Sequence, residues 1–324
     1  AAAIKTFKNT ELGETWVEEG EAPDWQRLVE RREDYPIGTI PCGGLLLVSG
    51  ADVQKDRIEA SVWAFGRGKE SWLIEQRVLM GDTAREAVWQ QLAGLLNETW
   101  THASGALLPL VRLTLDTGFA TQEAYAFVRK VKDSRVMAVK GVARGAALIG
   151  TPTAVDVTIN GRKLRRGVKV FSVAVGLAKL EFYNNLRKSP EVAADGTTLI
   201  YPPDYVHLPK VDADFIQQLC AEQLITRRNR QGFPVREWQK VRERSEGLDA
   251  AVYCRAAAAA ASLDRFEERH WLEIERQLGL EAKLPDPPVT LQPLDLEQAT
   301  HRGGLAASGA AKSGGRVIKS RWLS

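Results

Sequence analysis

Three apolar segments near the start of the chain constrain its fold more than any other feature. The run GLLLVSGADVQ at 44–54 is almost continuously apolar, which is typical of a central strand buried on both faces. RIEASVWAF at 57–65 and SWLIEQRVL at 71–79 alternate apolar and polar residues, and short turns separate the three segments. We therefore predict an antiparallel three-stranded meander over 44–79.

Helix-connected strands follow this meander. Segment 81–100 has the apolar spacing of a helix, RLTLD at 112–116 has the alternation of a short strand, and RVMAVKGV at 135–142 predicts a further strand. A helical pattern lies between the last two strands. The order β-β-β-α-β-α-β predicts an α/β fold, in which a mixed sheet of three antiparallel strands and then helix-connected strands is flanked by helices.

The next segments add a β-hairpin and more helices. Asn160-Gly161 is a strong turn dipeptide, and it predicts a hairpin over 151–175. Helical patterns follow at 176–188, at 212–226 and, as one long helix, at 248–278.

Length and composition indicate one large domain with extensions. At 324 residues and 44% hydrophobic composition, the chain can bury a substantial core. We expect this core within 42–278 and an extended lead-in over 1–41. Pro, Gly, Ala and Ser dominate 279–324, which we expect to be a flexible tail because it can bury too little apolar surface to order itself.

Several functional classes are excluded by what the sequence lacks. The three cysteines are widely spaced without a CxxC pair, and the four histidines complete no zinc pattern. No apolar run approaches the ~18 residues of a membrane span, and from the residues at the amino terminus we expect no signal peptide. FGRGKES at 65–71 lacks the spacing of an ATP-binding phosphate loop. We expect a reduced, cytosolic setting without a membrane segment.

Three aspartates are candidate metal ligands. Asp52 lies late in the first strand, Asp116 ends the fourth strand, and Asp249 opens the long helix with Glu246 one turn before it. If the first and fourth strands are neighbours, Asp52 and Asp116 emerge at the same edge of the sheet. Three such carboxylates suit Mg²⁺ or Mn²⁺, and two such ions can hydrolyse a phosphodiester. Spacing alone leaves open that these acids are turn and helix caps.

Five cations with no acid among them occur in the second strand of the predicted hairpin. They are Arg162, Lys163, Arg165, Arg166 and Lys169. Alternation should place several on one face, where the ribbon could bind a DNA phosphate backbone. An edge strand protected by positive charge is the open alternative. A second basic cluster over 227–244 is diluted by Glu237 and Glu243, and we interpret it as a solvated surface.

Seven stretches along the chain form a recognisable series. They are GADVQKDRIE (50–59), LDTG (115–118), VKG (139–141), VGLAKLEFYNNL, YVHLP, FIQQLCAEQ and SEGLDAAVY (245–253). Together, these motifs resemble the nuclease part of the phage lambda-type terminase large subunit (the GpA family). The similarity runs in order over roughly 5–265, and the lead-in FKNTELGETW looks like the family's connection from its ATPase domain.

The resemblance implies an RNase H-like fold and a metal-dependent endonuclease that cuts concatemeric double-stranded DNA. It carries the family's acidic cluster onto Asp52, Asp116 and Asp249, with two Mg²⁺ or Mn²⁺ ions, and Glu246 is a further candidate ligand. Implied partners are double-stranded DNA, a terminase small subunit, the portal of the procapsid and the ATPase domain of a longer chain, in the host cell cytoplasm.

Two other functions stay open beside the endonuclease. One is a non-catalytic module of the packaging motor that grips DNA through the basic hairpin and docks on the portal through its tail. The other is a resolvase or transposase on the same fold, which would share the acids but not the terminase lead-in.

Overall fold

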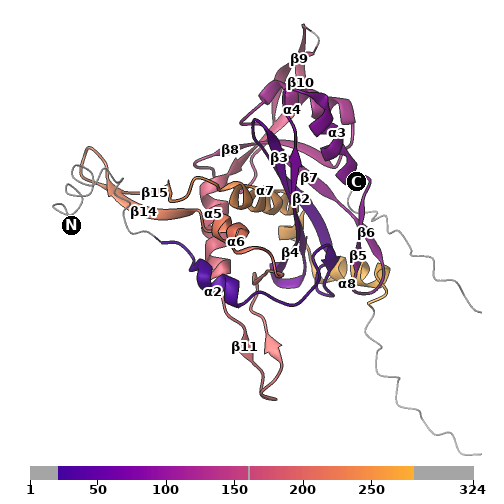
Figure 1. The fold of residues 1–324 in the computed structure, drawn as a ribbon, viewed down its shortest axis with the longest axis vertical. Coiled ribbons are helices and arrows are strands. Elements are labelled where there is room, and N and C mark those ends of the chain that lie inside the picture. The colour runs from indigo at the N-terminus through magenta and orange to yellow at the C-terminus, as the bar shows by residue number, and fades with distance from the viewer. Residues whose placement is uncertain (1–20, 160, 281–324) are drawn as a thin grey trace, which may run out of the picture.

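A central eight-stranded sheet with helices on both faces forms the body of the protein (Figure 1). The computed structural model describes residues 21–159 and 161–280. The sheet has the order β13-β4-β3-β2-β7-β8-β10-β9. Its strands are β2 (Leu46–Val53), β3 (Arg57–Phe65), β4 (Ser71–Met80), β7 (Arg112–Asp116), β8 (Val136–Val142), β9 (Thr153–Ile159), β10 (Arg162–Ala174) and β13 (Val206–His207).

The strand pairing confirms the predicted mixed sheet. β2, β3 and β4 pair antiparallel in sequence order, and all eight residues of β2 are buried. On its other side β2 pairs in parallel with β7, β7 pairs in parallel with β8, and β8 with β10. The order β4-β3-β2-β7-β8, with three antiparallel strands followed by helix-connected parallel strands, is the RNase H-like arrangement.

Helices cover both faces of this sheet. Helix α7 (Glu246–Ala260) lies directly on β2, where a Cβ atom at Gly50 would come within 2.4 Å of the Ala250 carbonyl oxygen, so only glycine permits this approach. Helix α4 (Thr121–Val131) lies on the opposite face, where Tyr125 packs with Ala138. The remaining helices are α2 (Trp25–Glu30), α3 (Glu86–Leu95), α5 (Val175–Leu186), α6 (Ala213–Leu219) and α8 (Glu268–Gln277).

The prediction of one long helix over 248–278 is wrong. The chain instead forms α7 and α8, separated by a 3-10 turn at Leu263–Arg265. Ser262 precedes this turn with φ 69°, a left-handed conformation that a continuous α-helix does not allow. The break separates the buried α7 from a helix whose only buried residue is Trp271.

Two other predicted helices are shorter than expected. The helix predicted over 212–226 ends at Leu219, and Glu222–Arg228 forms strand β14, which pairs with β15 (Pro234–Lys240) as a ribbon that projects from the body (Figure 1). The helix predicted over 81–100 ends at Leu95.

A small three-stranded sheet is formed by β1 (Thr39–Ile40), β5 (Thr99–His102) and β6 (Leu107–Pro109). A short ribbon, β11 (Glu191–Val192) with β12 (Leu199–Ile200), completes the strands, and Arg67–Lys69 is a 3-10 turn.

The predicted hairpin is confirmed, and it belongs to the main sheet. β9 and β10 pair antiparallel on either side of the predicted turn, whose Gly161 has φ 73°. β10 also pairs in parallel with β8, so the hairpin extends the edge of the sheet. The register shifts between Leu164 and Val168, where Arg166 has φ 49°. This bulge breaks the strict alternation that we expected along the strand.

About half of the predicted lead-in and almost all of the predicted tail lie outside the described residues. The lead-in is described from residue 21 onward, and within it Leu28 of α2 is buried in the core. The predicted tail is described only at residues 279–280. The boundaries of all three predicted parts stay predictions. Across the described parts of the chain, no helix is long and apolar enough to cross a lipid bilayer.

Candidate active site

Neighbouring strands bring Asp52 and Asp116 to one edge of the sheet. β2 and β7 run in parallel, and their register pairs the residues that immediately precede the two aspartates. Both carboxylates lie on the face that α7 covers. On that face, two residues before Asp116, the hydroxyl of Thr114 donates to the carbonyl oxygen of Tyr253 at 2.8 Å. Asp52 and Asp116 therefore lie at the same edge of the sheet, as the strand order predicted.

Asp249 in the first turn of α7 joins this edge. Asp52 is buried, and burial is the largest cause of the rise of its pKa to about 8. The negative charge of Asp249 raises that pKa further, and the charges of Asp116 and Glu246 add to it. A hydrogen bond from the Gln54 amide to Asp52 Oδ2, at 2.6 Å, acts in the opposite direction. The structure thus brings the three predicted aspartates within electrostatic reach of one another.

Asp116 is held by two hydrogen bonds. The hydroxyl of Tyr253 donates to Oδ1 at 2.9 Å, and the backbone N–H of Gly118 donates to Oδ2 at 3.1 Å. Burial nevertheless raises the pKa of Asp116, and the charge of Asp249 adds to the rise. A Cβ atom at position 118 would lie 3.0 Å from Oδ2 of Asp116, so glycine leaves room for the carboxylate beside this turn.

Lys179 of α5 is a site residue that the sequence interpretation missed. Its ammonium group is buried and lies 3.2 Å from Oδ1 of Asp249 and 2.7 Å from Oε1 of Glu222. Burial lowers the pKa of Lys179, but the two carboxylates outweigh it and leave the pKa raised, so the group carries its charge. Its only signal in the sequence was a lysine on an otherwise largely apolar helix.

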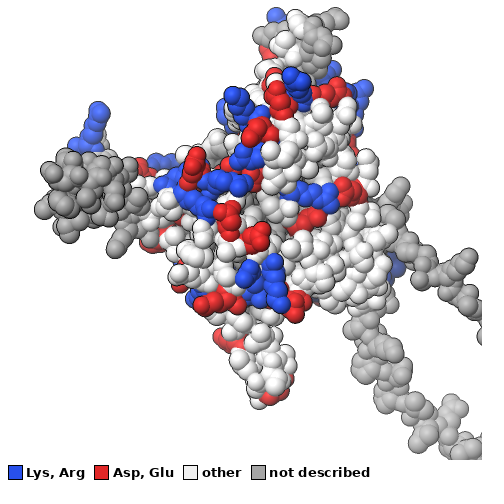
Figure 2. Space-filling model, viewed as in Figure 1, with Lys and Arg blue, Asp and Glu red and all other residues white. Residues whose placement is uncertain are grey.

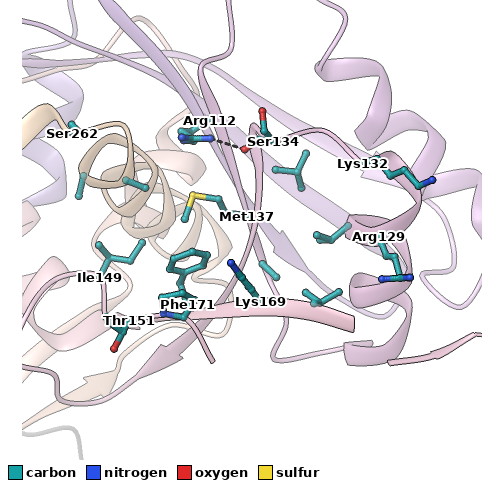
Figure 3. Close-up of a pocket in the computed structure, with 18 of the residues that line it drawn as sticks. Arg112, Arg129, Lys132, Ser134, Met137, Ile149, Thr151, Lys169, Phe171 and Ser262 are labelled. Atoms are coloured by element: carbon teal, nitrogen blue, oxygen red, sulfur yellow. Dashed lines mark hydrogen bonds between the residues drawn. The ribbon is translucent and has the colours of Figure 1, made fainter. Parts of the chain in front are cut away.

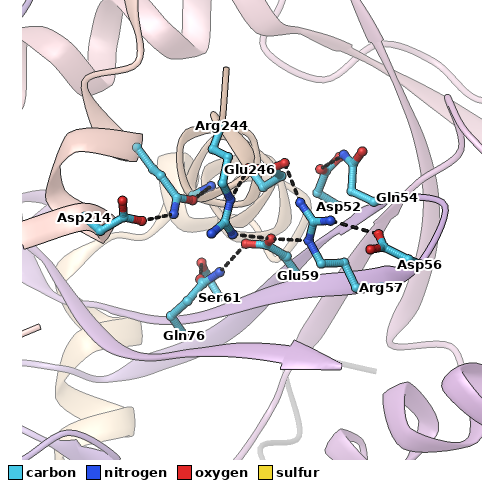
Figure 4. A network of polar contacts seen from close by, with 12 residues as sticks. Asp52, Gln54, Asp56, Arg57, Glu59, Ser61, Gln76, Asp214, Arg244 and Glu246 are labelled. Carbon is cyan, nitrogen blue, oxygen red and sulfur yellow. Dashed lines mark hydrogen bonds and ion pairs between the residues drawn. The ribbon is translucent and has the colours of Figure 1, made fainter. Parts of the chain in front are cut away.

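Glu246 belongs to a separate network beside the aspartates (Figure 4). One of its oxygens accepts from Arg57 at 2.8 Å, and Arg57 also binds the buried Glu59 at 2.7 Å. Arg244 binds Glu59 at 2.8 Å and lies 3.5 Å from Glu246. The side chain of Arg244 is 43% exposed, so it lies at the surface as interpreted and also pairs with the buried Glu59. Glu246 faces two arginines, while Asp52 and Gln54 lie beside this network.

The aspartates fit a hard divalent cation by their chemistry and their shared position. Carboxylate oxygens are the ligands that Mg²⁺ and Mn²⁺ prefer. Over 21–159 and 161–280, no three His, Cys, Asp or Glu side chains form a ready ligand group. Each of the three aspartates instead contacts a donor of the protein, Gln54, Tyr253 or Lys179. The raised pKa of Asp52 shows that ionising all three carboxylates at this edge is costly, and a cation between them would remove this cost.

The basic hairpin lies apart from the aspartates. β10 runs parallel to β7, so the start of β10, which carries the predicted cations, lies at the edge opposite Asp116. The side chains of Arg165, Arg166 and Lys169 are exposed, while those of Arg162 and Lys163 lie outside the description. On the face that Figure 2 shows, basic and acidic side chains are interspersed and form no continuous basic surface.

Comparison with known proteins decides the family. The model of the family described as "Terminase large subunit gpA, endonuclease domain" matches residues 1–271. The chain belongs to this family. It is 33% identical over 270 residues to the terminase large subunit of Escherichia phage lambda and 31% identical over 258 residues to that of Enterobacteria phage P21. These matches cover 81% and 78% of this chain but 40% and 38% of the relatives, so this terminase nuclease domain spans about two-fifths of their length.

Two solved structures of terminase nucleases overlap this domain weakly. The g2p (large terminase) nuclease domain of bacteriophage SPP1, solved with bound Mn, is 12% identical with a TM-score of 0.31, over 74% of this chain and 94% of that one. The large terminase nuclease of thermophilic phage G20c is 10% identical with a TM-score of 0.28, over 65% and 80%. The assignment of this terminase nuclease domain rests on the sequence matches alone.

Proposed function

We propose that this terminase nuclease domain is a metal-dependent endonuclease that hydrolyses phosphodiester bonds of double-stranded DNA. The convergence of Asp52, Asp116 and Asp249 from two strands and a helix at one sheet edge carries this proposal. Family membership supports the reaction class, since the matching family is described as an endonuclease domain.

The three aspartates would hold two Mg²⁺ or Mn²⁺ ions. Such ions, when bound, activate the attacking water and stabilise the leaving oxygen of the phosphodiester. Asp52 experiences the charges of both other aspartates, and for this reason we assign it to both ions. Asp116 and Asp249 would each contact one. Glu246 is the least direct candidate because Arg57 and Arg244 already neutralise it.

Three neighbouring side chains position these ligands. Gln54 donates to Asp52, Tyr253 donates to Asp116, and Lys179 holds Asp249. All three donors come from the body of the fold, so each carboxylate is oriented before DNA arrives.

We further propose that the domain acts within a DNA-packaging motor in the host cell cytoplasm. Its expected partners are concatemeric DNA, a terminase small subunit, the portal of the procapsid and an ATPase domain, as in the large subunits that it resembles. The non-catalytic alternative, a DNA-gripping and portal-docking module, predicts the same partners but no cleavage. Deleting 282–324 separates the two functions: cleavage should survive while binding to the procapsid is lost.

Cleavage of supercoiled plasmid with Mg²⁺ or Mn²⁺ tests the endonuclease. Asp52→Asn and Asp249→Asn should abolish cutting, while Asp34→Asn, an exposed aspartate paired with Lys210, should leave it unchanged. Circular dichroism confirms that each variant is folded. Cutting by Asp52→Asn at the parent rate would show that the site assignment is wrong.

A further inference from the structure

A large cavity opens at the edge of the sheet opposite the aspartates. Its volume is about 880 Å³, and it lies between the start of β8, the middle of β10, the end of α4 and the end of α7 (Figure 3). Arg112, at the start of β7, lines it. Asp116 ends the same strand four residues later, roughly 13 Å away at the usual rise of a strand. The cavity is therefore separate from the candidate active site.

Five cations and no acid line this cavity. They are Arg112, Arg129, Lys132, Lys169 and Arg265. None of them forms an ion pair with a carboxylate of the described residues. Two of the guanidinium groups donate only to backbone carbonyl oxygens, Arg112 to Ser134 at 2.6 Å and Arg129 to Gly167 at 3.2 Å. So many cations without acidic partners around one hollow favour an anionic ligand.

Asp133 does not neutralise the five cations that line the cavity. The negative charge of Asp133 acts on Arg112 and favours its charged form, but the Asp133 carboxylate forms its ion pair with Arg135, at 2.7 Å. Other arginines of the described residues do meet acids directly, as Arg57, Arg77 and Arg255 do. The positive potential of the cavity is therefore left for a ligand.

The floor of the cavity is apolar. Met137, Ile149 and Phe171 contribute to it, and Figure 3 shows Met137 and Phe171 beside Lys169. All three apolar side chains are only partly buried. A ligand that fits this lining carries negative charges along its outside and a flat apolar group that can lie against Phe171.

We propose that this cavity binds a single-stranded segment of DNA, with phosphates on the cations and a base against Phe171. Arg and Lys are the usual partners of DNA phosphates, and bases stack on aromatic side chains without sequence preference. The bases of a duplex are paired inside the helix and cannot reach a recessed floor. The volume lies in the ~300–1,000 Å³ range of sites that enclose small ligands, so only a few nucleotides enter.

This inference rests on the proposed function only in taking DNA as the substrate. Cuts staggered between the two strands would supply the single strands that it requires. Because the cavity lies at the opposite edge from Asp116, a strand bound there leaves the aspartates accessible. Binding and cleavage can therefore be measured independently.

Fluorescence anisotropy of a labelled oligothymidylate of about 10 nucleotides, with the full chain in EDTA, tests the proposal. Arg129→Gln with Lys169→Gln should raise Kd at least tenfold and reduce the slope of log Kd against log salt by about 0.7 per lost contact. The matched control removes two exposed cations that pair with acids elsewhere, Arg85→Gln with Lys210→Gln, and should change Kd less than about twofold.

Phe171→Leu separates stacking from charge. It keeps an apolar floor but removes the aromatic face, so Kd should rise severalfold with the salt slope unchanged. An unchanged Kd overturns the proposed placement of a base. Equal binding of a duplex, with equal weakening by Arg129→Gln and Lys169→Gln, overturns the preference for a single strand.

Two further comparisons complete the test. Polyglutamate that displaces the oligonucleotide at equal charge concentration shows a site for acidic peptides, which overturns a nucleic-acid site. Asp52→Asn should lose plasmid cleavage and retain oligothymidylate binding. A failure of the nuclease assignment thus appears in the cleavage assay, and a failure of the cavity assignment appears in the binding assay.

Discussion

The hydroxyl of Tyr253 donates a hydrogen bond to Oδ1 of Asp116 at 2.9 Å and so ties α7 to the end of β7. Tyr253 lies one turn after Asp249 on the same helix, so α7 presents both side chains along one face. The charges of Asp116, Asp52 and Asp249 together raise the pKa of Tyr253 beyond the effect of its burial. The phenol therefore stays protonated and lies among all three aspartates as a donor.

Removing this hydroxyl should weaken the site without unfolding the protein. We expect Tyr253→Phe to lower cleavage or metal affinity about 10- to 100-fold, as the loss of a partner behind a metal ligand usually does. The Mn²⁺ concentration that gives half-maximal plasmid cleavage measures this effect. Tyr125→Phe, on the opposite face of the sheet, is the matched control. Identical Mn²⁺ dependence for Tyr253→Phe and the parent would contradict a positioning role.

Replacing Lys179 should cost stability as well as activity. The ammonium group is buried between Asp249 and Glu222, so Lys179→Met leaves two carboxylates without their cation. Removing one partner of a buried pair typically costs about 3–5 kcal/mol in free energy of unfolding. Urea denaturation measures this loss. Lys179→Met with Glu222→Gln should recover part of the stability but none of the activity, and equal instability of both variants would argue against the pairing.

Divalent cations should stabilise the domain through the three aspartates. A cation that binds the folded chain alone raises Tm by mass action, and here it also relieves repulsion among the carboxylates. We expect Mn²⁺ to raise the Tm of the parent and of Asp34→Asn, but not of Asp52→Asn or Asp249→Asn. Differential scanning fluorimetry measures this without any nuclease assay. An equal shift in all four proteins would place the binding elsewhere.

The central sheet could be predicted from the sequence because its signal is local. The continuous apolar run at 44–54 is the pattern of a strand buried on both faces, and the alternation at 57–65 and 71–79 is the pattern of strands buried on one face. Asp52 and Asp116 could be placed at one edge because the strand order fixes which strands are neighbours. The same reasoning needs no knowledge of side-chain contacts, which is why it succeeded.

The missed features depend on contacts distant in sequence. Lys179 and Tyr253 reach their partners across 70 and 137 residues, and no local pattern marks such pairs. Strand β14 was predicted as helix because the apolar spacing of α6 continues into it, and only pairing with β15 makes it a strand. The break at Ser262 is similarly hidden, since the residues after it keep helical spacing.

A buried histidine far from the aspartates should make stability depend on pH. Nδ1 of His207 lies 2.8 Å from Glu33 and Nε2 lies 3.1 Å from Glu70, and the ring stacks on Trp72. Burial lowers the pKa of His207, but its hydrogen bonds with the two glutamates and their charges outweigh burial, so the pKa lies above its usual 6.5. Protonation therefore favours the folded state.

The sign of this effect follows from the raised pKa. The stabilisation is fully present below the unfolded pKa of about 6.5 and is lost as pH rises through the higher folded value. We expect the free energy of unfolding of the parent to exceed that of His207→Gln by more at pH 6 than at pH 9, measured by urea denaturation. Tyr201 and Tyr205, which contact the ring, have raised pKa values and do not titrate in this range, and the guanidinium of Arg31 lies 4.7 Å from the centre of the Tyr205 ring. A difference that stays constant between pH 6 and pH 9 would show that His207 keeps one protonation state throughout.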